Sequence, residues 1–169
     1  MKKLSVMTLL MLVAVTANAL QPADPARIDE IIERGSNVMP FDLNKTLHIF
    51  NKTASGGLQQ VIAKDSSDDG QIILIRKHLA GIAAQFAKGD FSGPQRIHGM
   101  DMPGVNELSA GAAQLRFSYQ DLPDGGQIEY VTDEPKLIDA VHRYFDAQLS
   151  DHARHAVTGG HGRHAGHRP

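Results

Sequence analysis

The sequence contains no cysteine and no tryptophan, and only 5% of its 169 residues are aromatic. The absence of cysteine excludes disulfides, thiolate zinc sites and iron–sulfur clusters. The formal net charge is only −2, so the chain lacks the basic surplus expected of a nucleic-acid-binding protein. A chain of this length has room for one modest domain, which core packing alone must stabilise.

Only the first residues form a strongly apolar run. Lys2 and Lys3 precede the run 4–15, and Ala17 and Ala19 supply the small residues that signal peptidase requires. The pattern predicts a signal peptide over residues 1–19. Because no cysteine is present for lipid attachment, we expect a periplasmic or secreted protein. About a dozen apolar residues are too few to span a bilayer, so we expect no membrane association after cleavage.

The remaining chain predicts a pair of similar units. Residues 20–44 indicate a short N-terminal helix and a lead-in, because Asp24 can cap a helix that begins at Pro25 and Gly35 can end it. Residues 45–152 then repeat the order ββα. In each half, two β-favouring segments flank a turn with a Gly-Gly pair, and a capped amphipathic helix follows. The strands are expected near 45–50, 58–64, 115–119 and 128–132, and the helices begin after Asp68 or Asp69 and after Asp133 or Glu134.

This ββαββα order predicts an α+β two-layer sandwich, with a four-stranded antiparallel sheet and two long helices on one face. The similar positions of His78 and His142 predict that they meet near the pseudo-twofold axis. Residues 90–112 are rich in glycine and proline and predict a long loop with one turn of helix near 105–108. Residues 153–169 predict a disordered tail.

Histidine is unusually frequent, with nine residues, none of them in the leader. Five lie in the last 18 residues among glycine, alanine and arginine: His152, His155, His161, His164 and His167. Flexible histidine-rich tracts bind borderline ions such as Cu(II), Ni(II) or Zn(II). The alternative is a solubilising tail that gains charge in mildly acid surroundings.

A second group, His98, Met100 and Met102, lies in the predicted loop. Imidazole and thioether ligands bind copper without a thiolate, and thioether favours Cu(I). The alternative is that the methionines fill gaps where the loop crosses the core, as methionine often does. Spacing alone leaves both interpretations open.

Three further histidines lie on predicted regular elements. His48 shares a strand face with Thr46 and Phe50, and His78 borders an apolar helix stripe. His142 lies one turn from Asp146, whose carboxylate could orient the imidazole ring. A single histidine in such a place is more often a hydrogen-bonded packing residue, so a metal site requires these imidazoles to converge in the fold.

Motifs of common enzymes are absent from the sequence, including G-x-S-x-G, the phosphate-binding loop and H-E-x-x-H. We therefore expect no enzyme. A hydrolase or lyase with His98 and Asp101, or His142 and Asp146, as an acid–base pair is a weaker alternative.

Several strings resemble those of small exported bacterial proteins that are labelled aspartate carbamoyltransferase. They include Phe41-Asp42-Leu43, the segments 71–79, 97–104 and 145–152, and Gly89-Asp90-Phe91. The resemblance covers about residues 38–155 and includes His78, His98, His142 and His152. It implies membership of this group, but the Ser-x-Arg-Thr phosphate-binding motif of carbamoyltransferases is absent, so we expect no such activity and assign no catalytic residue.

The sequence therefore predicts a periplasmic metal-binding protein with histidine and methionine ligands. Copper is the expected ion, zinc and nickel are alternatives, and a periplasmic protein is a further possible partner. The competing hypothesis is a module that binds a small ligand or a protein through a solvated sheet face with Arg116, Gln127 and Glu129, in which the histidines are structural.

Overall fold

The computed structural model describes residues 21–159. The predicted leader and His161, His164 and His167 lie outside the described residues. The helices and strands are α1 (Pro25–Ser36), β1 (Thr46–Thr53), β2 (Gly56–Ala63), α2 (Asp69–Phe86), α3 (Ser92–His98), α4 (Val105–Ala110), β3 (Arg116–Leu122), β4 (Gly125–Val131), α5 (Pro135–Asp151) and β5 (Ala156–Thr158).

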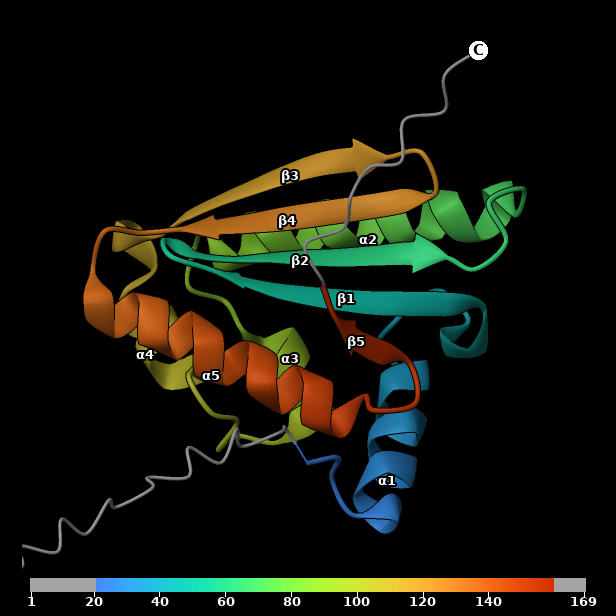
Figure 1. The fold of residues 1–169 in the computed structure, drawn as a ribbon, viewed down its shortest axis with the longest axis horizontal. Helices are drawn as coiled ribbons and strands as arrows, with labels where there is room; N and C mark the ends of the chain where they lie inside the picture. The colour runs from blue at the N-terminus through green and yellow to red at the C-terminus, as the bar shows by residue number, and fades with distance from the viewer. Residues whose placement is uncertain (1–20, 160–169) are drawn as a thin grey trace, which may run out of the picture.

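The sheet has five strands in the order β3-β4-β2-β1-β5 (Figure 1). The hairpins β1–β2 and β3–β4 join through antiparallel pairing of β2 with β4. β5 runs parallel to β1 at the edge of the sheet. The α+β class is confirmed, but the predicted four-stranded, purely antiparallel sheet with two long helices is wrong, because β5 joins the edge in parallel and the described residues form five helices.

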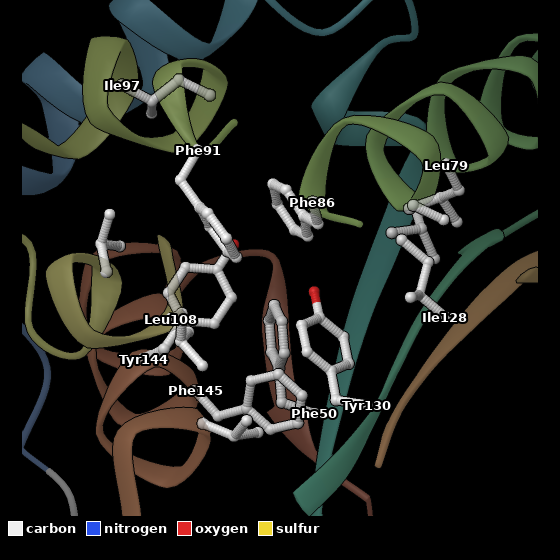
Figure 2. Packing of buried hydrophobic residues seen from close by; sticks show 14 of the residues in the cluster. Phe50, Leu79, Phe86, Phe91, Ile97, Leu108, Ile128, Tyr130, Tyr144 and Phe145 are labelled. Carbon is white, nitrogen blue, oxygen red and sulfur yellow. The ribbon is translucent and has the colours of Figure 1, made fainter. Parts of the chain in front are cut away.

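Each long helix packs on the hairpin of the other half of the chain. α2 packs mainly on β3 and β4, whereas α5 packs on β1 and β2. Tyr130 of β4 is fully buried between them, with Phe86 of α2 and Phe145 of α5 at ring-centroid distances of 6.2 and 5.2 Å. Figure 2 shows these aromatic rings packed together beside Phe50 and Phe91. Each helix therefore ties its own half of the chain to the other.

Local sequence chemistry explains where α1 and α2 begin. The carboxylate of Asp24 accepts a hydrogen bond from the backbone N–H of Ala26, and Pro25 occupies the first turn. Asp68 caps α2 in the same way through the N–H of Gln71. Both predicted caps are confirmed.

Three other expectations differ from the structure. The predicted loop 90–112 contains α3 in addition to the helical turn expected near 105–108, which is present as α4, and part of the predicted disordered tail forms β5. His78 and His142 do not meet near a pseudo-twofold axis: His78 lies beside Phe41, whereas His142 lies against the turn between β1 and β2. Within residues 21–159, none of the helices has the length and apolar composition needed to cross a bilayer.

A cavity lined by histidines is the candidate functional site

A cavity of about 380 Å³ lies between the sheet and the helices α2, α3 and α5. Four histidines line it: His48 from β1, His78 from α2, His98 from the end of α3 and His152 from the residue that follows α5. The segment 38–41 closes one side. Residues from five distant parts of the chain thus form one compartment.

Three of these imidazoles form a contiguous cluster. The ring of His152 lies 5.4 Å from that of His48 and 4.9 Å from that of His98, measured between centroids. His48, His98 and His152 are 5%, 5% and 3% exposed. His48 faces inward because it alternates with the buried residues Thr46 and Phe50 on β1.

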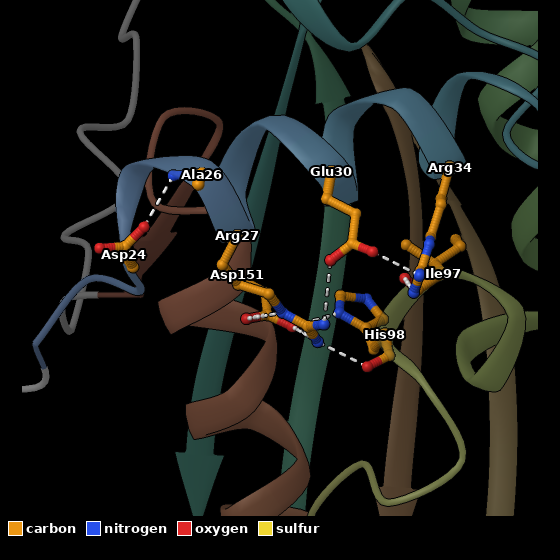
Figure 3. Close-up of polar contacts among 8 residues, drawn as sticks. All are labelled: Asp24, Ala26, Arg27, Glu30, Arg34, Ile97, His98 and Asp151. Carbon is orange, nitrogen blue, oxygen red and sulfur yellow. Dashed lines mark hydrogen bonds and ion pairs between the residues drawn. The ribbon is translucent and has the colours of Figure 1, made fainter.

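His98 is held by a buried carboxylate. Its Nδ1 lies 2.7 Å from Oδ2 of Asp151, and the guanidinium of Arg27 donates to the same oxygen at 3.0 Å (Figure 3). Arg27 also donates to the backbone carbonyl of His98. A carboxylate that accepts from Nδ1–H fixes the ring and leaves Nε2 as the basic nitrogen.

Other imidazole nitrogens in this region have no hydrogen-bond partner among the described residues. They are Nε2 of His48, Nδ1 of His152 and Nδ1 of His155. His155 adjoins the cluster through its backbone, since its carbonyl accepts from the N–H of His48 at 2.8 Å. An unpaired buried polar atom costs about 1–3 kcal/mol, so each of these nitrogens requires a water molecule or a ligand as its partner.

Burial makes these histidines weak bases. Desolvation and the neighbouring imidazoles, His155 first, lower the pKa of His48 to about 3. Desolvation lowers the pKa of His78 to about 4 and that of His152 well below the ordinary value. These rings are therefore neutral at neutral pH and have a lone pair available for a metal ion or a hydrogen-bond donor.

The charge of Asp151 is also stabilised. Burial alone would raise the pKa of this carboxyl, but hydrogen bonds from His98 and Arg27 outweigh it and hold the pKa below the ordinary value. Asp151 thus remains an anion that accepts from both neighbours. On its far side a second, open cavity of about 510 Å³ includes Arg27, Met100 and Asp101.

The cluster is not a preformed metal cage. Within residues 21–159, no three histidine, aspartate or glutamate side chains surround a point at which an ion could be held. The geometry instead offers neutral, closely spaced imidazoles that line a cavity. Such a wall can accept hydrogen bonds from a ligand, or bind an ion once the rings rotate.

The structure separates the remaining predicted ligands. Nε2 of His142 lies 3.0 Å from the carbonyl oxygens of both Thr53 and Gly56, and both oxygens accept a hydrogen bond from it. Met100 is 68% exposed, whereas Met102 is buried in the hydrophobic core. Met39 lines the cavity instead.

The predicted acid–base pairs are absent. His98 bonds to Asp151 rather than Asp101, and Asp146 pairs with Lys52 rather than with His142. On the solvated sheet face, Arg116 lies near Glu129 and donates to Ser118, while Gln127 bonds to Gln60 and Gln120. These polar groups largely satisfy one another.

Sequence analysis missed Asp151, Arg27, Gln59, Gln148 and Tyr144. Gln59 accepts a hydrogen bond from Tyr130, and Gln148 donates to Tyr144 at 2.8 Å. Gln59 lies between Gly57 and Val61, and Gln148 lies between Phe145 and Leu149. A glutamine among apolar positions of a strand or helix is the pattern that could have indicated a polar inner wall.

Comparison with known proteins gave no match: no protein-family model, no curated protein and no solved structure is significantly similar to this chain.

Proposed function

We propose that the folded domain binds a metal ion through His48, His98 and His152, and that copper is the favoured ion. The observation that supports this function is the cluster of three buried imidazoles with ring centroids 4.9 and 5.4 Å apart. Neutral imidazole is the commonest protein ligand for copper, zinc and nickel. Since the chain has no cysteine, imidazole nitrogen and thioether sulfur are the softer ligands that remain beside the carboxylates.

His98 supports the proposal most directly. The contact of its Nδ1 with Asp151 is the arrangement by which metal-binding histidines are usually oriented through their second nitrogen. Met39 lines the same cavity, and a thioether is a ligand for Cu(I) but a poor one for Zn(II). This methionine is the reason to favour copper.

Binding requires a small rearrangement. Metal–imidazole bonds are about 2.0–2.1 Å long, so two or three ring nitrogens must converge on one point. The unpartnered nitrogens of His48 and His152 are free to turn without breaking a hydrogen bond. In this proposal the protein is exported to the periplasm, and His161, His164 and His167 capture the ion or pass it on.

The test is a titration of the mature chain, and of a chain that ends at Gly159, with Cu(I), Cu(II), Zn(II) and Ni(II). The shorter chain retains His155 and β5. A site in the folded domain should survive this truncation and stabilise the fold by about 2.7 kcal/mol when the free ion is at 100 times its Kd. Calorimetry gives the stoichiometry, and thermal unfolding gives the stabilisation.

The double variant His48→Leu/His152→Leu should lose this stabilisation in the chain that ends at Gly159. His142→Leu is the matched control, because this histidine bonds to two backbone carbonyls far from the cluster. Stabilisation that persists in the double variant, or disappears equally in the control, would contradict the proposed site. Binding that vanishes on truncation would assign it to the tail.

A further inference from the structure

Two glycines line the cavity at positions where a larger side chain would not clash with neighbouring atoms. Gly81 lies in the interior of α2, and Gly93 lies in the first turn of α3; both line the cavity. A Cβ atom added at either position would meet no atom within 4 Å, and neither residue has a positive φ. Glycine in a helix interior is less favourable than alanine. Gly81 is itself exposed, so the absence of a side chain there leaves the mouth of the cavity open.

The rim of this cavity is positively charged. Lys77 of α2 and Arg96 of α3 are exposed lining residues, and no aspartate or glutamate lines the cavity. Neither cation forms an ion pair with a residue in the described part of the chain. Asp90, the carboxyl whose pKa responds to Arg96, is itself exposed to solvent.

Behind this rim, the lining combines apolar and neutral polar side chains. Phe41, Leu79 and Ile97 form apolar walls, and all three are buried. The buried neutral groups of His48, His152, Gln59, Gln148 and Tyr144 also line the cavity. Nε2 of His48 and Nδ1 of His152 have no hydrogen-bond partner among the described residues, so the lining can still form hydrogen bonds to a ligand.

We propose that this cavity binds a small organic monoanion with an apolar body and a separate hydrogen-bonding group. The carboxylate lies at Lys77 and Arg96, the apolar body packs on Leu79 and Ile97, and the hydrogen-bonding group bonds to the buried neutral imidazoles and amides. A volume of about 380 Å³ lies in the range of pockets for small organic ligands, and is far larger than an ion requires. This site is an addition to the proposed metal function and does not depend on it.

The probe is 3-(4-hydroxyphenyl)propionate, titrated into the metal-free full chain by calorimetry. Its amide and its analogue without the phenolic hydroxyl test the two ends separately. We expect saturable binding at one site, weakened about tenfold or more in each analogue, because each loses one polar contact in a partly desolvated pocket. Lys77→Glu should weaken binding of the acid by a similar factor and leave binding of the amide unchanged.

Gly81→Leu separates ligand binding from folding. The substitution should weaken binding of the probe by about tenfold or more by covering the mouth of the cavity, while the variant remains at least as resistant to urea as the parent because leucine favours a helix. Ala84→Leu, at an exposed position of the same helix outside the cavity, is the control and should bind normally.

Binding that is unchanged in Gly81→Leu or in Lys77→Glu, or the absence of saturable binding, would overturn this inference. Copper titration of the same variants distinguishes the two proposals. Gly81→Leu should weaken binding of the organic ligand and retain the ion-induced stabilisation, so this variant tests the organic site alone. Loss of copper binding in His48→Leu/His152→Leu tests the metal site.

Discussion

At the scale of single residues, the buried imidazoles link folding to pH. His48 has a pKa of about 3 in the folded chain and His78 one of about 4, because burial penalises their charged forms. In the unfolded chain both titrate near 6.5. Between these values the unfolded state binds protons that the folded state excludes, so stability is present above pH 6.5 and is lost as the pH falls.

We therefore predict that the free energy of unfolding decreases between pH 6.5 and 5, before carboxylates begin to titrate. Each such histidine contributes a slope of up to about 1.4 kcal/mol per pH unit. In His48→Leu the slope should fall by about that amount, as measured by urea unfolding at several pH values. An equal slope in the variant and the parent would show that His48 binds a proton in the folded state.

The histidines were also the residues that sequence analysis identified most usefully, although their partners were not predictable. Asp101 is three residues from His98, but it is exposed, whereas Asp151 is 53 positions away and bonds to the ring. Local spacing identifies an acid within one helical turn. It contains no information on which distant helix end will lie beside the loop.

At the scale of elements, one side chain from each long helix forms hydrogen bonds to the turn of the hairpin that the helix covers. Arg76 of α2 donates to the carbonyls of Gly125 and Leu122 in the β3–β4 turn. His142 of α5 donates to Thr53 and Gly56 in the β1–β2 turn. The counterpart of His142 is therefore Arg76 and not His78, which explains why the predicted meeting of the two histidines is wrong.

Removing the contact in His142→Leu should destabilise the fold by about 1–2 kcal/mol, because two turn carbonyls lose their donor. The exposed control Lys136→Ala in the same helix should change stability by less than about 0.5 kcal/mol. Urea unfolding of both variants gives the comparison. A neutral effect of His142→Leu would mean that water replaces the imidazole at the turn.

The elements that sequence patterns missed are short or contain loop-forming residues. In β5, Val157 and Thr158 favour a strand, but three residues are too few to show a period, and the strand forms by pairing with β1. α3 contains Pro94 and Gly93, which normally indicate a loop. By contrast, the hairpins and long helices have strong periodicity, and these were predicted correctly. The side-chain cap predicted for the second long helix is wrong, because Glu134 precedes α5 without a capping hydrogen bond from its side chain.

At the scale of the whole molecule, the chain contains two sets of histidines with different chemistry. In the folded domain, His48 and His152 are buried and stay neutral in mild acid, because burial lowers the pKa of both. The set at His161, His164 and His167 lies outside the described residues, and the sequence predicts a tail in which imidazoles titrate near 6.5. Protons should therefore compete with a metal ion for the second set first.

This difference predicts how copper divides between the two sets as the pH changes. From pH 7.5 to 5.5 the neutral fraction of an imidazole with a pKa of 6.5 falls by about tenfold, so affinity at the tail should fall by at least that factor for each ligand. Affinity in the chain that ends at Gly159 should change by less than about threefold, because His48 is already deprotonated at both pH values. Calorimetry of the two chains at both pH values measures the division. Equal loss of affinity in both chains would contradict a site formed by buried imidazoles.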